Sequence, residues 1–261
     1  MHIVVCIKQV PETRDVAMDP DKGVLRRSEA AGKLNPFDLY AVEAAVGIKE
    51  KLTGRVTAIT MGPPQAEQVI RESFLMGTDE GVLLSDPAFA GADTLATAFT
   101  LARGISLLDR PDLIICGIQT TDGDTGQVGP GIAEFLGLPH ASYVRSIREI
   151  TREGLLVEQD LGDRIAIVSL PYPCLITVGK GIGQPRLPSF RRLLATKDFP
   201  VVTWGSKELG FGDEVYFGLD GSPTQVERIF PPKIEREQII FEDGDLARQL
   251  YQKLVELKFV G

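Results

Sequence analysis

Short apolar runs that alternate with longer segments of helical spacing constrain the fold of this chain more than any other feature of its sequence. The first run, residues 2–7 (HIVVCI), is continuous and β-branched, as expected of a strand that is buried on both faces. Further strands are predicted at residues 55–60, 81–84 and 112–116. Segments with helical spacing separate or follow them, at residues 35–51, 65–75, 93–108 and 129–136. This alternation predicts an α/β fold with a doubly wound, mostly parallel sheet.

The pattern changes in the second half of the chain. A short strand is predicted at residues 140–143, and residues 155–160 and 164–170 have the pattern of an antiparallel hairpin. Residues 174–178 predict one more strand. After about Phe199, proline, glycine and charged residues dominate, and the sheet pattern is lost.

We therefore expect an α/β domain over residues 1–199 and a C-terminal extended arm with a helix over residues 200–261. The helix is predicted at residues 243–258, with Asp243 or Asp245 as its N-cap. Its apolar stripe consists of Leu246, Leu250, Leu254 and Leu257. Two arrangements suit such an arm: it packs on a partner protein, or it folds back on its own domain.

Charge and cysteine content narrow the class of protein. A net charge of −8 argues against a surface for duplex nucleic acid or for an anionic membrane, because both require a basic face. The three cysteines, Cys6, Cys116 and Cys174, lie in apolar contexts without CxxC spacing, which predicts buried thiols. No apolar run reaches 18 residues, and the first residues enter a strand pattern instead of a signal peptide. These features predict a cytoplasmic protein or a mature soluble chain.

The candidate binding loops follow the strands. In doubly wound sheets, ligands lie outside the carboxyl ends of the strands near the topological switch point. Four loops would therefore face one crevice, at residues 8–10, 61–64, 85–93 and 117–127. The chain has neither a P-loop nor a GxGxxG motif after its first strand, and its only histidines, His2 and His140, exclude a multi-histidine metal site. No metal is expected.

The loop at residues 117–127 is rich in glycine, aspartate and threonine but contains no lysine, arginine or histidine. Three interpretations fit Asp122, Asp124 and Thr125: a Mg²⁺ or acid–base site, N-caps for the following helix, or a dinucleotide cradle. The third is favoured by the predicted position at the crevice, since glycines admit close backbone approach and helix N–H groups can face phosphate.

Residues 91–97 repeat this chemistry at another helix start, although Asp93 as a simple N-cap is a strong alternative. Two such starts at one crevice indicate a nucleotide with an extended phosphate chain. Residues 179–183 (GKGIG) superficially resemble a phosphate loop, but their place after a late strand favours a plain turn.

Several stretches resemble the small (beta) subunit of electron transfer flavoproteins, in the same order and spacing over about residues 1–190. They are VCIKQVPET (5–13), LNPFDLYAVEAA (34–45), TMGPPQAEQVIRESFLMGTDEG (60–81), CGIQTTDGDTGQVGP (116–130) and LPYPCLITV (170–178) with QPR (184–186). The resemblance implies a Rossmann-like, nucleotide- or FAD-binding domain and a heterodimer with an alpha subunit that carries its own FAD. It also implies that the C-terminal arm packs on that alpha subunit.

The stretches at residues 122–130 and 89–97 resemble the electron-bifurcating, NADH-dependent branch of the family. In that branch the crevice holds a complete FAD, which accepts hydride from NADH and divides the electrons between the alpha-subunit FAD and a low-potential acceptor such as ferredoxin or flavodoxin. In the ordinary branch the same crevice holds structural AMP, and the protein shuttles electrons from acyl-CoA dehydrogenase-type enzymes. Either way the protein is an electron-transfer subunit without catalytic acid–base residues, because the flavin supplies the redox chemistry.

The resemblance assigns cofactor contacts by position. The adenylate and phosphates would be held by Cys6, Lys8, Asn35, Gly117, Asp122, Gly123, Asp124, Thr125, Gly126 and Gln127. The pyrophosphate, ribityl chain and flavin would lie along Asp93, Thr94 and Thr97. The nicotinamide nucleotide, NAD(H), would be bordered by Met61, Gly62 and Pro63.

Residues 187–194 occupy the partner-docking loop of the family, with Phe190, Arg191 and Arg192 as candidate contacts. A basic loop with an exposed apolar residue suits an acyl-CoA dehydrogenase-like or other flavoprotein dehydrogenase. The alternative is that Phe190 is a core residue. The chain departs from the family at residues 183–186, where GQPR replaces Asn-Glu-Pro-Arg, so the identity of the partner stays open.

A third hypothesis is a free-standing adenine-nucleotide enzyme, such as an ATP pyrophosphatase, on a similar sheet. Such enzymes carry an SGGxDS-type loop after the first strand. This chain has KQVP at residues 8–11 instead, which counts against the hypothesis.

Overall fold

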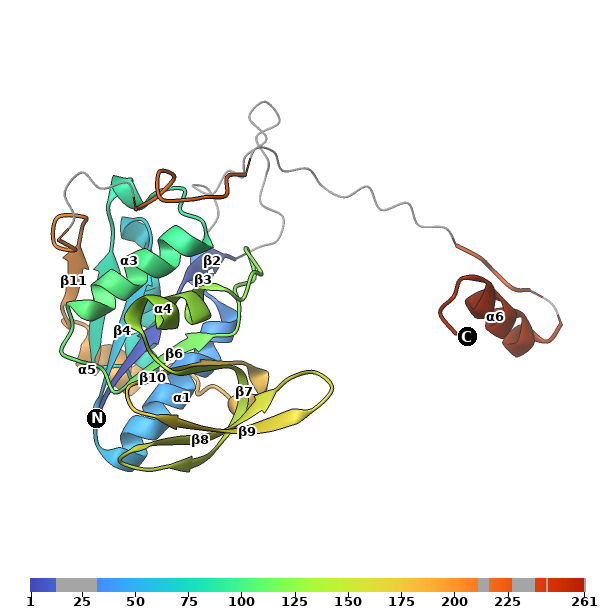
Figure 1. Cartoon of the computed structure of the whole chain (residues 1–261), viewed down its shortest axis with the longest axis horizontal. Helices are drawn as coiled ribbons and strands as arrows, with labels where there is room; N and C mark the ends of the chain where they lie inside the picture. The colour runs from blue at the N-terminus through green and yellow to red at the C-terminus, as the bar shows by residue number, and fades with distance from the viewer. Residues whose placement is uncertain (13–31, 211–215, 227–237, 243, 261) are drawn as a thin grey trace. The chain divides into compact units, whose positions relative to one another are not determined.

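The computed structural model describes residues 1–12, 32–210, 216–226, 238–242 and 244–260 (Figure 1). The chain divides into two compact units, Met1–Glu227 and Arg228–Gly261, and each is considered by itself.

The first unit is built on a nine-stranded sheet with the order β11-β5-β4-β1-β6-β10-β7-β8-β9. In chain order its strands are β1 (His2–Cys6), β4 (Arg55–Met61), β5 (Glu80–Leu84), β6 (Leu113–Gly117), β7 (His140–Ile150), β8 (Gly154–Asp160), β9 (Ile165–Pro171), β10 (Cys174–Val178) and β11 (Val201–Trp204). All pairings from β11 to β7 are parallel, whereas β7, β8 and β9 pair antiparallel. The predicted doubly wound, mostly parallel sheet is confirmed. A separate two-stranded sheet joins β2 (Gln9–Pro11) to β3 (Gly32–Leu34).

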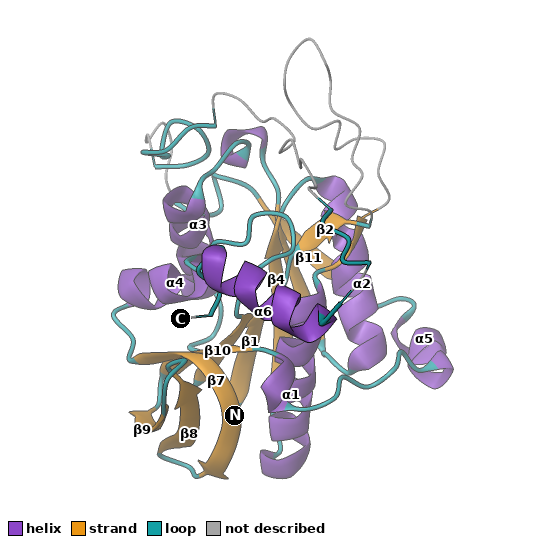
Figure 2. Ribbon diagram, turned by 90° about the vertical axis from the view of Figure 1, so that its right-hand side faces the viewer, coloured by secondary structure: helices purple, strands orange, loops and turns teal. Residues whose placement is uncertain are grey.

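Helices cover both faces of the parallel part of the sheet (Figure 2). On one face α1 (Pro36–Leu52) and α2 (Glu67–Met76) pack against Ile3 and Val5, and on the other α3 (Thr94–Ser106) and α4 (Val128–Leu136) pack against Val4 and Cys6. The side chains of residues 3–6 alternate between two cores, so these four positions have to be apolar. Burial of each such aliphatic side chain contributes roughly 1.5–3 kcal/mol to folding.

The topological switch point lies between β1 and β6. After β1 the chain continues through α1 to β4 on one side of β1, and after β5 it returns to place β6 on the other side. The segments that follow β1 and β6 therefore lead to helices on opposite faces of the sheet. Doubly wound sheets bind ligands between the carboxyl ends of such strands, and we call this position the crevice.

Two strands differ from the prediction: β11 was not predicted, and β7 is longer than predicted. The sheet pattern was expected to end near Phe199, yet β11 pairs in parallel with β5 at the edge of the sheet. Four residues with partly exposed side chains are too few to show a period, and the unit reaches Glu227, past the predicted boundary at residue 199. The strand predicted at residues 140–143 is the 11-residue β7, whose register shifts interrupt the alternation that would have revealed its length.

The remaining helices are short or isolated. Single 3₁₀ turns occur at η1 (Pro64–Ala66), η2 (Pro87–Phe89) and η3 (Lys180–Ile182), and α5 (Phe190–Thr196) follows β10. In the second unit α6 (Leu246–Glu256) confirms the predicted helix, with Asp245 as its N-cap. The alternative cap, Asp243, lies outside the described residues. None of the described helices has the length and apolar character needed to cross a membrane.

Candidate functional site

Lys8 supplies the cation that the loop at residues 117–127 lacks. It follows β1, and its Nζ lies 2.8 and 2.7 Å from the two carboxylate oxygens of Asp122. Burial on its own would raise the pKa of Asp122, but the charge of Lys8 and its hydrogen bond outweigh burial and lower the pKa. Opposite sides of the switch point thus contribute an ammonium group and an ionised carboxylate that are paired with each other.

Asp38 lies beneath this pair and was not anticipated from the sequence. Its Oδ2 accepts the backbone N–H of Lys8 at 2.8 Å, and its Oδ1 accepts the Asn35 amide at 2.9 Å. Burial raises the pKa of Asp38 to about 7, opposed by the hydrogen bonds from Asn35 and Lys8. A Cβ on Gly117 would lie 2.3 Å from Asp38 Oδ1, so the close approach of the two segments requires glycine there. The sequence did contain a signal: a charged residue on the inner face of an otherwise apolar first helical turn.

Asn35 supports the loop from below. It is 0% exposed, its Nδ2 donates to the Gln119 carbonyl at 2.9 Å, and its Oδ1 accepts the Thr121 N–H at 3.3 Å. The buried amide of Asn35 thus bridges the start of α1 and the loop, and its role as a cofactor contact stays a prediction.

The end of the loop carries left-handed backbone and leads into α4. Asp124 and Gly126 have φ values of 53° and 64°. The N-cap of α4 is Gln127, and no side chain caps this helix end. The interpretation of Asp122, Asp124 and Thr125 as N-caps is therefore wrong. An α4 N-terminus without a side-chain cap presents N–H groups and the positive end of the helix dipole, both of which favour an anion.

The start of α3 differs in this respect. Asp93 Oδ1 accepts the N–H groups of Leu95 and Ala96 at 2.9 and 3.1 Å, which confirms the N-cap alternative for this residue. Its Oδ2 accepts the backbone N–H and the hydroxyl of Thr224 at 3.1 and 2.7 Å. Burial would raise the pKa of Asp93, but hydrogen bonds from Thr224 and the α3 backbone lower it. Thr224 lies in the segment that was expected to be an arm, and no sequence pattern marked it.

One hydrogen bond joins the two helix starts. Thr94 Oγ donates to Gln127 Oε1 at 2.9 Å, so the predicted contacts at the starts of α3 and α4 lie at one crevice. Thr97 lies one turn further along α3 and is half-buried. A Cβ on Gly123 would meet only Thr120 Oγ, at 3.5 Å, so this part of the loop is open.

Other predicted contacts lie at the edge of this arrangement or inside the core. Met61 ends β4, the neighbour of β1, and Gly62 donates its N–H to the Leu84 carbonyl at 3.0 Å, while Pro63 is exposed. The Cys6 side chain is buried in the core with Cys116. A hydrogen bond to Cys6 and burial raise the pKa of the Cys116 thiol, and Cys174 is also buried, as predicted.

Residues 180–182 form a single 3₁₀ turn, η3, with Ile182 N–H donating to the Gly179 carbonyl at 3.0 Å. The turn predicted for residues 179–183 is therefore present. In the described residues, no group of three or more histidine, cysteine, aspartate or glutamate side chains is arranged to hold a metal ion.

The donors and acceptors of the crevice fit an adenine nucleotide. Lys8 and the α4 N–H groups suit phosphate, the carboxylates of Asp122 and Asp124 suit ribose hydroxyls, and the open glycine at position 123 leaves room for close approach.

The candidate docking residues fall into two groups. Phe190 is 73% exposed, so its interpretation as a core residue is wrong, and Arg191 is exposed as well. Arg192 instead donates to the backbone carbonyls of Phe74 and Thr78, at 2.9 and 2.8 Å.

Comparison with known proteins identifies the family. The sequence matches the electron transfer flavoprotein domain over residues 22–208. It is 43% identical over 259 residues to the electron transfer flavoprotein subunit beta of Thermoanaerobacterium thermosaccharolyticum, covering 98% of this chain and 97% of that protein. It is 42% identical over 233 residues to the caffeyl-CoA reductase-Etf complex subunit CarD of Acetobacterium woodii, covering 89% and 88%. Protein FixA of Bradyrhizobium diazoefficiens is 37% identical over 267 residues, covering 100% and 92%.

These relatives are matched over nearly their whole length, and the domain match spans most of the sheet that builds the crevice. The chain therefore belongs to the electron transfer flavoprotein family, among its beta subunits.

Proposed function

We propose that this chain is the beta subunit of an electron-bifurcating electron transfer flavoprotein and binds a complete FAD in the crevice between β1 and β6. Hydride from NADH enters there, and the electrons divide between the FAD of an alpha subunit and a low-potential acceptor such as ferredoxin or flavodoxin. The proposed setting is a cytoplasmic heterodimer.

The hydrogen bond between Thr94 and Gln127 carries the proposal. It places the starts of α3 and α4 at a single crevice, and the α4 start lacks a side-chain cap. An adenylate occupies the neighbourhood of one helix start, whereas a pyrophosphate with a further substituent extends towards a second. Joined helix starts therefore support a dinucleotide over a mononucleotide.

The residues of the chain bind and orient. Lys8 and the α4 N-terminus hold phosphate charge, while Asp122 and Asp124 accept hydrogen bonds from hydroxyls. Asp38 and Asn35 fix the distance between the two loops from beneath. When bound, FAD supplies the hydride and single-electron chemistry, which no side chain of the crevice provides.

The proposed dehydrogenase partner is supported by the name of one relative, CarD, and by the exposed residues of the docking loop. CarD is named as a subunit of a caffeyl-CoA reductase complex. A similar assembly for this chain would join it to an acyl-CoA dehydrogenase-like flavoprotein, with Phe190 and Arg191 exposed at the docking loop.

A second candidate function is that of an ordinary subunit with structural AMP in the crevice. One observation favours it: the Asp93 carboxylate is fully engaged by the α3 backbone and Thr224, which leaves it without a free oxygen for a ribityl chain. In this case the start of α3 would border the nucleotide site without contacting a flavin.

A cofactor count separates the two candidates. The chain is purified with its alpha subunit, and FAD and AMP are quantified after denaturation. Two FAD per heterodimer, with bleaching of the flavin absorbance by NADH, is the expected result. One FAD and one AMP without a response to NADH would establish the second candidate instead.

A variant pair ties the cofactor to the crevice. Lys8→Met is expected to weaken nucleotide retention about tenfold, the usual effect of losing one charge-assisted hydrogen bond to phosphate. Arg148→Gln is the matched control, because Arg148 pairs with Glu158 on the antiparallel strands at 2.7 Å, away from the crevice. Equal nucleotide retention by both variants would show that Lys8 does not contribute to nucleotide binding.

A further inference from the structure

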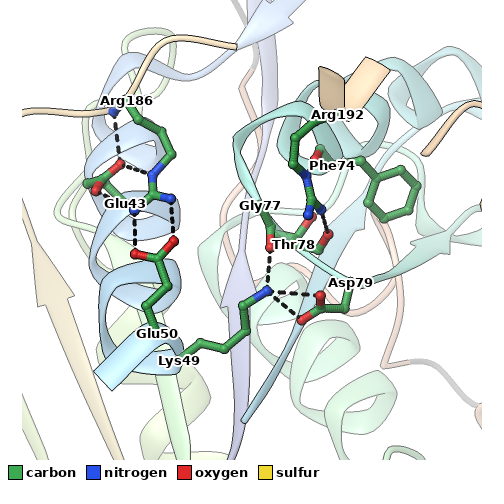
Figure 3. A network of polar contacts seen from close by, with 9 residues as sticks. All are labelled: Glu43, Lys49, Glu50, Phe74, Gly77, Thr78, Asp79, Arg186 and Arg192. Atoms are coloured by element: carbon green, nitrogen blue, oxygen red, sulfur yellow. Dashed lines mark hydrogen bonds and ion pairs between the residues drawn. The ribbon is translucent and has the colours of Figure 1, made fainter. Parts of the chain in front are cut away.

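Arg186 and Arg192, at either end of residues 186–192, are hydrogen-bonded to α1 and to the end of α2 (Figure 3). The attachments are made by two arginines of the same segment. Each of them uses most of its guanidinium for contacts within the molecule, although the sequence suggested basic residues available to a partner.

Arg186 is attached to α1. Its Nε and Nη2 donate to the carboxylate of Glu43 at 2.8 and 3.0 Å, and its Nη1 and Nη2 donate to that of Glu50 at 2.7 and 3.1 Å. Its backbone N–H also donates to Glu43, at 2.8 Å. Paired carboxylates on one face of a helix match the planar fork of arginine, and lysine cannot reproduce this geometry.

Arg192 is attached to the end of α2. It donates to the carbonyls of Phe74 and Thr78, close to the C-terminus of α2 and the negative end of its dipole. Ser189 adds two bonds, from its N–H to the Leu75 carbonyl at 3.3 Å and from Arg192 N–H to its Oγ at 3.4 Å.

The two anchor points are themselves joined. Lys49 of α1 donates to the Gly77 carbonyl at 2.7 Å and to the Asp79 carboxylate at 2.9 and 3.0 Å (Figure 3). The helix that holds Arg186 is thereby tied to the turn that holds Arg192. The segment closes a frame whose other sides are α1 and the turn after α2.

This frame presents apolar side chains to solvent. Leu187, Phe190 and Leu194 are 86%, 73% and 65% exposed. Large apolar side chains exposed within one short segment indicate an interaction site, and a surface ordered before binding avoids the entropy cost of ordering it at that moment.

We propose that Arg186 and Arg192 are positioning residues that hold residues 187–194 as a preformed apolar docking surface for a flavoprotein dehydrogenase. The occupant rests on the proposed function, whereas the frame rests on the contacts of this chain alone. The role is separated from a contribution to global stability by comparing amide exchange of residues 187–194 with that of core amides, which open only on global unfolding.

Hydrogen exchange of the whole heterodimer tests the frame without any partner. Arg186→Gln is expected to accelerate amide exchange of residues 187–194 about tenfold, as loss of a charge-assisted contact lowers the local opening free energy. Arg186→Lys should lie between this variant and the parent. Arg148→Gln, which breaks an ion pair on the antiparallel strands, should leave the segment unchanged. Unchanged exchange in Arg186→Gln would overturn the frame.

Electron transfer to an acyl-CoA dehydrogenase, used as the probe protein, tests the docking role. Arg186→Gln and Phe190→Ala are each expected to raise the KM for this dehydrogenase about tenfold with kcat and cofactor content unchanged, because both weaken association and neither touches the crevice. Faster exchange with an unchanged KM in Arg186→Gln would overturn the positioning role. The proposed dehydrogenase partner would be wrong if Phe190→Ala had the parental KM, or if the parent protein transferred no electrons to the probe. The exchange data would still show whether Arg186 holds residues 187–194 in place.

Discussion

Polar residues have opposite roles at the amino and carboxyl ends of the parallel strands, which we call the amino edge and the carboxyl edge of the sheet. At the amino edge, His2 Nε2 lies 2.9 Å from Thr57 Oγ, which donates to Glu80 at 2.7 Å, and Arg55 donates to Asp109 at 2.7 Å. Each of these groups is paired with a neighbour from an adjacent strand or loop. The network joins β1, β4, β5 and the segment before β6, and its geometry is that of a structural tie.

At the carboxyl edge the polar groups converge on a crevice. Lys8 and Asp122 meet from opposite sides of the switch point, α4 begins without a side-chain cap, and the buried Asp38 has a pKa raised by burial to about 7. Perturbed carboxyl groups and uncapped helix ends are typical of binding sites. In this protein the candidate binding site and the structural network both consist of polar residues, and they are distinguished by lying at opposite ends of the parallel strands. Three variants test this comparison.

The largest effect is expected from Asp38→Asn, measured as unfolding free energy against pH. The carboxyl has an ordinary pKa of 3.8 and a folded value of about 7, so between these values the folded protein holds a proton that the unfolded chain has lost. Asp38 therefore makes stability fall as pH rises from 4 to 7, by on the order of 4 kcal/mol in total. In the variant this component is absent, and the curve flattens across that window.

Urea unfolding of parent and variant at matched pH values gives the difference directly. Parallel curves from pH 4 to pH 7 would show that Asp38 titrates normally. The carboxyl edge would then lack the perturbed carboxyl pKa that sets it apart from the amino edge.

Gly117→Ala is expected to have the next largest effect. The new Cβ would lie 2.3 Å from Asp38 Oδ1 and 3.0 Å from the backbone of Phe37, so one of the two segments has to move. Overpacking of this kind costs roughly 1–3 kcal/mol and should also weaken nucleotide retention, because it displaces the floor of the crevice.

Gly123→Ala is its matched control in the same loop, since the added Cβ has an ordinary 3.5 Å contact. Calorimetric melting together with the nucleotide content after gel filtration measures both properties. Equal losses in the two variants would show that the loop is sensitive throughout, and that the fit between Gly117 and Asp38 is not special.

The smallest effect is expected at the amino edge, from His2→Ala. Loss of the contact with Thr57 should lower the unfolding free energy by about 1 kcal/mol and leave nucleotide retention unchanged. Burial lowers the pKa of His2, so the unfolded chain takes up its proton at a higher pH than the folded protein. The stability from His2 is complete above about pH 6.5 and is lost as pH falls through the folded value. Loss of the nucleotide in His2→Ala would contradict the conclusion that the polar residues at the amino edge have only a structural role.

Much of this arrangement could be predicted because it depends on local pattern. The apolar run of β1 identified a strand buried on both faces, and glycines with acidic residues after residue 116 marked the candidate binding loop. Other features had no local signal. The four residues of β11 are too few for a period, and Thr224 reaches Asp93 across 131 residues of sequence.

By itself, the sequence determined the sheet, its parallel direction and the set of loops at its carboxyl edge, because hydrophobic periodicity and turn residues act over a few neighbouring positions. The tertiary structure decided what those loops contain. Lys8 supplies the missing cation across 114 residues, Asp38 becomes a buried group with a raised pKa, and Asp93 caps α3 while α4 stays uncapped. These properties depend on distance and desolvation, which exist only once the strands have assembled in the order that opens the crevice.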